Sequence, residues 1–232
     1  MTSLKNKVAL VTGSARGIGK AIAVRYGSLG ASVVVNYSTD GKRAQETVEE
    51  IERVGSIAIA VQADISKVAD IDRLFAAALD KFGRLDIVVA NAGIELVGQS
   101  VLDLMEADFD RLFGINTKGS FFTLQKAAKH VADNGRIIYI GSSSTAFPMP
   151  GLALYGGSKV APRVFFEAPA QEGFEVQLLC EQRECKKTAQ TPPEENLGQV
   201  AASHNWRSPL RALKSRTSDQ VVFRAPRSRC RQ

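Results

Sequence analysis

Short apolar runs alternate with longer amphipathic segments along the front of the chain. The runs are apolar at nearly every position and rich in β-branched residues, a pattern typical of strands buried on both faces of a parallel sheet. They occupy residues 7–12, 32–36, 57–62, 85–90 and 136–141. We therefore expect these runs to form strands of one parallel sheet.

The segments between the runs have helical periodicity. Three of them end on glycines suited to helix C-caps, namely Gly30, Gly55 and Gly83. Residues 108–135 form the longest segment and predict one or two helices. Strands that alternate with helices of this length predict a doubly wound, Rossmann-like α/β fold with right-handed crossovers, as a single domain.

Composition excludes several classes of protein. With 44% hydrophobic and 23% charged residues, the 232-residue chain is typical of a soluble globular protein. It has no run of ~18 apolar residues that could span a membrane, and its start lacks the layout of a secretory leader. We expect a cytoplasmic protein without membrane contact.

The positive charge is confined to the end of the chain. Residues 1–179 hold 19 basic and 19 acidic residues, whereas residues 180–232 hold 11 basic and 5 acidic residues and carry the whole net charge of +6. Nucleic-acid binding is not expected, because the arginines are scattered and only Trp206 and Phe223 could stack on bases.

Cysteines and histidines indicate neither disulfides nor a metal. The three cysteines all follow residue 179 and are too few and too irregularly placed to predict disulfides. His130 and His204 have no partners at ligand spacing, so no metal site is expected.

A glycine-rich loop, "VTGSARGIG" at 11–19, follows the first expected strand and opens the first helix. Gly13 permits a tight turn, while Gly17 and Gly19 let backbone amides at the helix start approach a pyrophosphate. The spacing is G-x-x-x-G-x-G. We expect this loop to bind a dinucleotide.

The end of the second strand bears on the choice between NAD and NADP. An NAD site usually has an acid there to hold the ribose 2′-hydroxyl, but this chain has Asn36, Tyr37 and Ser38. The nearby Asp40 fits better as the N-cap of the next helix.

Basic side chains near the same strand end favour NADP over NAD. Arg16, Lys42 or Arg43 could neutralise a 2′-phosphate, and no carboxylate in the corresponding place faces it. We therefore predict NADP as the cofactor.

Further motifs follow the glycine loop in order. They are "ADI" at 63–65, "ANAG" at 90–93, "INTKGSFF" at 115–122, "IGSSS" at 140–144 and "YGGSK" at 155–159. Over residues 5–161 the chain resembles the short-chain dehydrogenase/reductase family, particularly reductases of 3-oxoacyl thioesters, naphthol-type polyketides or sugar-like alcohols. The resemblance implies hydride transfer between a nicotinamide and a small-molecule ketone or secondary alcohol.

The catalytic residues implied by the resemblance are Asn116, Ser142, Tyr155 and Lys159. Tyr155 and Lys159 share one helix face, so the lysine can favour the tyrosinate of an acid–base tyrosine. In the family this lysine also binds the nicotinamide ribose. Ser142 would polarise the carbonyl, and Asn116 would support the Lys159 end of a proton relay. Taken alone, Asn116 could cap a helix and the serines could form a turn.

The motifs also imply a set of cofactor contacts. The expected residues are Gly13, Ser14, Arg16, Gly17, Ile18, Gly19, Asn36, Tyr37, Ser38, Asp64, Ile65, Asn91, Ala92, Gly93, Tyr155 and Lys159.

The resemblance ends near Pro162. A proline lacks the backbone N–H and collides with the preceding turn, so we expect the helix of Tyr155 and Lys159 to be interrupted there. The only later strand-like runs are 176–179 and 220–223, and the family's sixth strand, Pro-Gly turn, substrate loop and seventh strand cannot be identified.

Two regions are therefore expected, a nucleotide-binding reductase core at 5–161 and an atypical basic segment at 162–232. The segment is either an out-of-frame reading, from a frameshift or altered splicing, or a diverged tail. The alternative to an active enzyme is a truncated product that binds cofactor without turnover. A homodimer or homotetramer is expected if the segment permits it.

Overall fold

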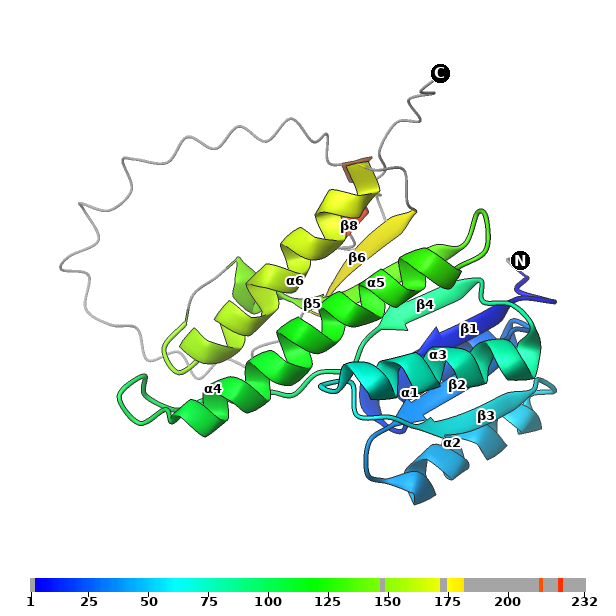
Figure 1. Ribbon diagram of the computed structural model, residues 1–232, viewed down its shortest axis with the longest axis horizontal. Coiled ribbons are helices and arrows are strands. Elements are labelled where there is room, and N and C mark those ends of the chain that lie inside the picture. The colour runs from blue at the N-terminus through cyan, green and yellow to red at the C-terminus, as the bar shows by residue number, and fades with distance from the viewer. Residues whose placement is uncertain (1–2, 147–148, 172–174, 182–212, 215–220, 223–232) are drawn as a thin grey trace.

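The computed structural model describes residues 3–146, 149–171, 175–181, 213–214 and 221–222 (Figure 1). A six-stranded parallel sheet has helices on both faces, and its strand order is β3-β2-β1-β4-β5-β6. The strands are β1 (Val8–Val11), β2 (Ser32–Tyr37), β3 (Ala58–Gln62), β4 (Ile87–Ala90), β5 (Arg136–Ser142) and β6 (Val176–Glu181). The five expected strands and the doubly wound fold are confirmed.

The strand order reverses between β1 and β4. β1 pairs with β2 on one side and with β4 on the other, so the chain winds outward in both directions from this point. In open α/β sheets the crevice at such a reversal, beyond the carboxyl ends of the strands, is where ligands bind. The glycine loop follows β1 and the "ANAG" motif follows β4, so both lie at this crevice.

The helices form two layers. They are α1 (Gly17–Ser28), α2 (Gly41–Arg53), α3 (Val68–Phe82), α4 (Glu106–Phe113), the π-helix η1 (Gly114–Gly119), α5 (Ser120–His130), the 3₁₀-helix η2 (Ser143–Thr145) and α6 (Ala153–Gln171). The expected long helical segment is thus α4, η1 and α5 in succession, and Figure 1 shows α6 beside α5.

Alternate strand residues bury against different layers. Leu10 of β1 lies in a core cluster with Leu74 of α3 and Phe166 of α6, whereas the adjacent Val11 lies in a second cluster with Ile51 of α2. All five side chains are fully buried. Burying a side chain of this size stabilises the fold by ~1.5–3 kcal/mol, so the sheet is held from both faces.

The helix boundaries follow the expected capping residues. The Asp40 side chain accepts a hydrogen bond from the Arg43 N–H at 3.0 Å and caps α2. Gly30, Gly55 and Gly83 have φ values of 94°, 86° and 70° just after α1, α2 and α3, where a side chain would be strained. These capping predictions are confirmed.

Asp86 forms hydrogen bonds at the amino-terminal ends of β1 and β4, on the side of the sheet opposite to the crevice. The carboxylate lies just before β4, is 3% exposed, and accepts hydrogen bonds from the Val8 N–H at 3.0 Å, Arg84 Nε at 2.8 Å and Lys7 Nζ at 3.1 Å. Burial alone would raise the pKa of Asp86, but these donors, Arg84 foremost, outweigh it and lower the pKa. The ionised carboxylate therefore stabilises the fold.

The expected interruption at Pro162 does not occur, because α6 continues through this residue to Gln171. Pro162 is buried in the structure. The proline removes the donor for the carbonyl of Ser158, and this carbonyl accepts a hydrogen bond from Thr117 Oγ1 at 2.8 Å instead. The lost helical bond is therefore replaced from η1.

A sixth strand is present, contrary to the expectation for the segment after residue 162. β6 pairs with β5 from Ile137↔Val176 to Ser142↔Glu181, and Val176 joins the same core cluster as Phe166. The expected Pro-Gly turn, substrate loop and seventh strand belong to a part of the chain that lies mostly outside the described residues. Of that part, β7 (Leu213–Lys214) and β8 (Val221–Val222) form an antiparallel pair.

Candidate active site

The glycine loop is shaped for close contact with a phosphate. Gly13 has φ +62°, and a Cβ there would lie 2.9 Å from the Cα of Ala92 in the loop after β4. Gly17 opens α1 with φ +59°, and a Cβ there would meet nothing within 4 Å. The start of α1 has neither a side-chain cap nor an acidic residue in its first turn. Its N–H groups and open space fit the pyrophosphate of a dinucleotide.

Thr12 and Asn91 join the loops after β1 and β4. Thr12 Oγ1 accepts hydrogen bonds from the N–H groups of Asn91 and Ala92, both at 3.0 Å. Asn91 Nδ2 donates to the carbonyls of Thr12 at 2.9 Å and Gly13 at 3.2 Å. A Cβ on Gly19 would lie 2.5 Å from Asn91 Nδ2, so glycine lets the first turn of α1 approach this amide.

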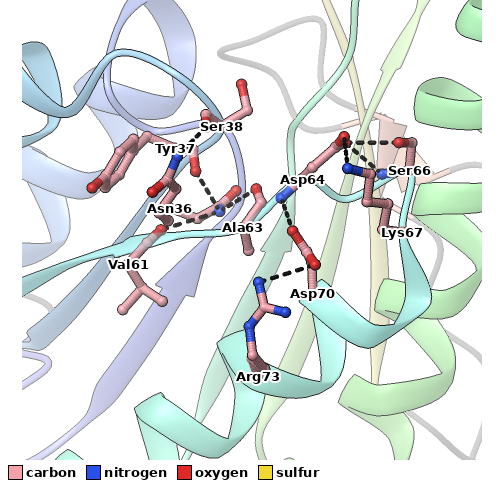
Figure 2. A network of polar contacts seen from close by, with 11 residues as sticks. Asn36, Tyr37, Ser38, Val61, Ala63, Asp64, Ser66, Lys67, Asp70 and Arg73 are labelled. Atoms are coloured by element: carbon pink, nitrogen blue, oxygen red, sulfur yellow. Dashed lines mark hydrogen bonds and ion pairs between the residues drawn. The ribbon is translucent and has the colours of Figure 1, made fainter.

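The Asn36 carboxamide is engaged by backbone groups (Figure 2). Its Oδ1 accepts a hydrogen bond from the Gly13 N–H at 2.9 Å, and its Nδ2 donates to the Ala63 carbonyl at 3.1 Å, with a longer contact of 3.4 Å to the Val61 carbonyl. The residue is 2% exposed. Its polar atoms are therefore directed at the protein, where they fasten the glycine turn to the ends of β2 and β3.

Ser14 is also turned inward. Its hydroxyl donates to the Val11 carbonyl at 2.7 Å and accepts from the Asn36 N–H at 3.1 Å. Tyr37 is half-buried and Ser38 is exposed, so these two residues form the rim where the second strand ends. Arg16 and Ile18 are exposed on the loop itself, as a contact with a bound molecule requires.

The turn after β3 is held by two carboxylates (Figure 2). Asp70 of α3 accepts a hydrogen bond from the Asp64 N–H at 2.9 Å, and this bond is the main cause of the lowered pKa of Asp70. Asp64 Oδ1 accepts from the N–H of Ser66 at 3.0 Å and from its hydroxyl at 2.8 Å. The half-buried Asp64 and the buried Ile65 are thus fixed at the crevice, next to the Asn36 network.

The Tyr155–Lys159 turn of α6 lies against the carboxyl end of β5. Lys159 is 5% exposed, and its Nζ lies 3.4 Å from the carbonyl of Ile140, two residues before Ser142, and 5.5 Å from the centre of the Tyr139 ring. Tyr155 is half-buried in the first turn of the same helix. Tyr155 and Lys159 thus lie one helical turn apart, with the Lys159 ammonium at the end of β5.

Ser142 ends β5 and is 8% exposed. Its Oγ lies 2.9 Å from Ser144 Oγ and accepts from the Ser144 N–H at 3.3 Å. A Cβ on Gly156 would lie 3.4 Å from the Ser144 carbonyl, so this turn packs against the start of α6. Ser142 therefore shapes the turn, which lies beside the start of the helix that carries Tyr155.

Asn116 is fully buried in η1 and connects three segments. Its Oδ1 accepts from the Ile94 N–H and its Nδ2 donates to the Ile94 carbonyl, both at 2.9 Å, while Nδ2 also donates to Ser158 Oγ at 2.9 Å. A Cβ on Gly93 would lie 3.0 Å from Lys159 Nζ and 3.1 Å from Asn116 Oδ1. Asn116 Oδ1 and the Lys159 ammonium therefore both lie close to Gly93.

A model of the short-chain dehydrogenase family matches residues 7–181. The chain belongs to the short-chain dehydrogenase family. The match continues past Pro162 to the end of β6, which agrees with the sixth strand of the sheet.

Two fungal members of the family illustrate the relationship. Hydroxynaphthalene reductase-like protein Arp2 of Metarhizium majus is 50% identical over 164 residues, which cover 70% of this chain and 61% of that protein. Short-chain dehydrogenase/reductase GME11373 of Pestalotiopsis microspora is 48% identical over 168 residues, covering 72% and 63%. This chain therefore spans less than two thirds of the length of these curated relatives.

Solved members of the family share the fold. A short-chain dehydrogenase of Burkholderia cenocepacia, solved in complex with NADP, has a TM-score of 0.72 and 37% identity, covering 76% of this chain and 73% of that chain. The landomycin C-6 ketoreductase LanV, solved with bound NADP and rabelomycin, has a TM-score of 0.71 and 35% identity, covering 77% and 76%.

Within this short-chain dehydrogenase, the described residues contain no cluster of three or more His, Cys, Asp or Glu side chains that could hold a metal ion. Across the same part of the chain, no helix is both long and apolar enough to cross a membrane.

Sequence reasoning missed the residues that connect the site to its surroundings. Thr12, Thr117 and Ser158 lie inside the quoted motifs, yet each has a single polar group that could equally face solvent. Their partners on other elements, the Ala92 N–H for Thr12, the Ser158 carbonyl for Thr117 and Asn116 Nδ2 for Ser158, are identified only in the folded chain.

Proposed function

We propose that this chain is an NADP-dependent oxidoreductase that acts on a ketone or secondary alcohol, with Asn116, Ser142, Tyr155 and Lys159 as its machinery. The observation that carries the proposal is the buried Lys159, which reaches the end of β5 one helical turn after Tyr155. A buried ammonium is costly unless it has a partner or a ligand, and a role beside an acid–base tyrosine would account for the burial of Lys159.

NADP as the cofactor is supported by the loop and by the family. The open start of α1 fits a pyrophosphate, and the rim at Tyr37 and Ser38 has no carboxylate where a 2′-phosphate would lie. Two solved relatives contain NADP. The residues proposed to hold it are Gly13, Arg16, Gly17, Ile18, Gly19, Tyr37, Ser38, Asp64, Ile65, Asn91, Ala92, Gly93, Tyr155 and Lys159, while Ser14 and Asn36 support the loop from within.

The proposed chemistry divides among four side chains. When bound, NADPH supplies the hydride that reduces a carbonyl carbon. Tyr155 donates the proton to the carbonyl oxygen, and the Lys159 ammonium stabilises the tyrosinate that remains. The Ser142 hydroxyl orients the same oxygen. Asn116 holds Ile94 and the adjacent Gly93 in place around Lys159.

The proposed substrate site lies beside the first turn of α6. A cavity of about 570 Å³ is lined by Gly98 and Val101 from the loop after β4 and by Met149 and Ala153 from the approach to α6. Its mixed small and apolar lining suits a flat ketone, and relatives are named as a hydroxynaphthalene reductase-like protein and a C-6 ketoreductase. We therefore propose an aromatic or polyketide-like ketone as the substrate class.

Self-association is proposed from the surface of the helices. Phe109, Phe121, Val160 and Val164 are 48%, 38%, 44% and 56% exposed on α4, α5 and α6. In Figure 1, α4 and α5 follow one another along one line and α6 lies beside them. Exposed apolar side chains on neighbouring helices suit contact with a second copy. A homodimer or homotetramer is the proposed assembly.

A second candidate function is cofactor binding without turnover. It is favoured by one observation, which is that this chain covers only 61% of a relative to which it is 50% identical. A substrate pocket could depend on the remaining part of such a protein.

Titration of the full chain with NADPH and NADH, followed by a screen of aromatic ketones for NADPH consumption, tests the proposal. Turnover that Tyr155→Phe abolishes while NADPH affinity is retained supports the oxidoreductase. Binding without turnover of any ketone favours the second candidate. Failure to bind either nucleotide contradicts both.

A further inference from the structure

Pro162 lies inside α6, three residues after Lys159. In a regular α-helix the N–H at position 162 would donate to the carbonyl of Ser158, one residue before Lys159. Proline has no N–H, and its ring also presses on that carbonyl. Without a substitute donor, the turn that carries Tyr155 and Lys159 would contain a buried carbonyl without its hydrogen bond.

Thr117 provides the substitute donor. Its hydroxyl donates to the Ser158 carbonyl at 2.8 Å, and Ser158 is completely buried, so water cannot replace the bond. A buried carbonyl is rarely left unpaired in folded proteins, because its lost hydration is not otherwise compensated. The bond crosses from η1 to α6 and is not part of the helical ladder.

The side chain of Ser158 forms a second connection to η1. Its hydroxyl donates to the Tyr155 carbonyl at 2.7 Å and accepts from Asn116 Nδ2 at 2.9 Å. Ser158 therefore joins the backbone of Tyr155 to Asn116, and its own carbonyl to Thr117. Both connections are made by Ser158, which lies between Tyr155 and Lys159 of the proposed machinery.

Both connections start from the π-helical turn η1. Asn116 and Thr117 are adjacent there, and they contact the hydroxyl and the carbonyl of Ser158 respectively. Single π-helical turns inside α-helices are frequent at functional sites.

We propose that Thr117 and Ser158 are positioning residues, which hold the Tyr155–Lys159 turn against η1 and replace the hydrogen bond that Pro162 removes. The inference rests on the proposed function for its catalytic consequence. It makes Thr117 and Pro162 a coupled pair, since an N–H at position 162 would make the Thr117 hydroxyl dispensable.

The test compares Thr117→Val, Pro162→Ala and the double variant in the full chain, with kcat and KM for NADPH-dependent ketone reduction. We expect Thr117→Val to lower kcat about tenfold, because misplacing a proton donor or its lysine raises the transition-state barrier more than it weakens binding. In the double variant the new N–H pairs with Ser158, so kcat should return to within about threefold of Pro162→Ala alone. Thr117→Ser, which keeps the hydroxyl, should remain active.

Thr123→Val is the matched control. Thr123 of α5 is 1% exposed, and its hydroxyl has no hydrogen-bond partner among the described residues. The same chemical change there removes no bond, so kcat should be unchanged. Ser158→Ala, which breaks the connection between Asn116 and the Tyr155 carbonyl, is a second variant and should also lower kcat at nearly constant KM.

The outcomes separate the inference from the proposed function. Equal kcat in Thr117→Val and the wild type, or a loss that Pro162→Ala does not reverse, overturns the inference. A wild type that binds NADPH without turnover contradicts the proposed function instead. The inference is then decided by the NADPH affinities of the wild type, Thr117→Val, Pro162→Ala and the double variant, because Lys159 is among the proposed NADPH contacts. An affinity that Thr117→Val weakens and the added Pro162→Ala restores supports the inference. Independent effects of the two substitutions reject it.

Discussion

The two halves of the site are held by different kinds of contact. Around the glycine loop, Thr12, Asn36 and Asn91 bond to the main chain of neighbouring strands whose register the sheet already fixes. Around α6, Ser158 and Thr117 bond one helix to another, and one of these bonds replaces a helical bond. The cofactor half is part of the sheet framework, while the catalytic half depends on a few bonds between helices.

This difference predicts separable effects of substitution. Changes to the buried amides of the cofactor half should alter folding and NADPH affinity together, because these amides serve both the sheet and the loop. Changes in the catalytic half should alter kcat while the fold is retained, because the helices keep their apolar contacts with the core. Four substitutions test this separation.

Lys159→Met should have the largest effect. Methionine preserves most of the apolar stem but removes the charge beside Tyr155, and we expect kcat for ketone reduction to fall by ~10³, within the range of general acid–base contributions. The urea midpoint should change little, which would show that Lys159 contributes to catalysis and not to the stability of the fold. Lys118→Met, at an exposed position of η1, is the control and should retain full kcat. A kcat within threefold of wild type for Lys159→Met would contradict the mechanism.

Asn36→Asp should be the most damaging change in the cofactor half. The substitution places a carboxylate oxygen where Nδ2 now donates to the Ala63 carbonyl at 3.1 Å, and it buries a charge without a partner. We expect the free energy of unfolding to fall by ~3 kcal/mol and NADPH affinity to fall with it. Urea denaturation and nicotinamide fluorescence measure the two quantities. Asn134→Asp makes the same change at an exposed site, and equal losses in both variants would remove the special role of Asn36.

The sheet could be predicted from the sequence because the residues that specify each strand and helix lie within or next to that segment. The β-branched runs, the Asp40 cap and the glycines after α1, α2 and α3 each specify their own segment, and all of them agree with the structure. The glycine loop was predicted for the same reason, since its turn and helix start are contiguous in the chain.

The contacts that connect distant segments could not be predicted in this way. The sequence alone suggests a break at Pro162, because the compensating hydroxyl belongs to Thr117, far earlier in the chain. The hydrogen bonds of the Asn36 amide could not be predicted either, because its partners, Gly13 and Ala63, lie on other segments. The place of β6 belongs to the same class, because residues 176–179 are a strand-like run whose position as the sixth strand is set only by its pairing with β5.

Asp86→Asn should affect stability and leave the site intact. Because the folded-state pKa of Asp86 is lowered below the unfolded value of ~3.9, the carboxylate contributes stability above that pH, and the contribution is lost as pH falls through the folded pKa. At pH 7 we expect a loss of ~2 kcal/mol by urea denaturation, which shrinks below about pH 4. NADPH affinity should not change, since Asp86 lies at the opposite edge of the sheet. Asp80→Asn, at an exposed position of α3, is the control, and a pH-independent difference would contradict the assignment.

Ser38→Asp should have the smallest effect and the most specific one. Ser38 is exposed at the rim of β2, so a carboxylate there costs little stability but repels a 2′-phosphate. One such repulsion in water corresponds to about a tenfold weaker NADPH affinity, while NADH affinity should be unchanged or improved. The ratio of the two dissociation constants, measured by fluorescence titration, is the decisive quantity, and Asn134→Asp controls for the added negative charge. An unchanged ratio would show that the 2′-phosphate lies elsewhere, and Arg16 would be the next residue to replace, because it is exposed on the glycine loop that faces the same crevice.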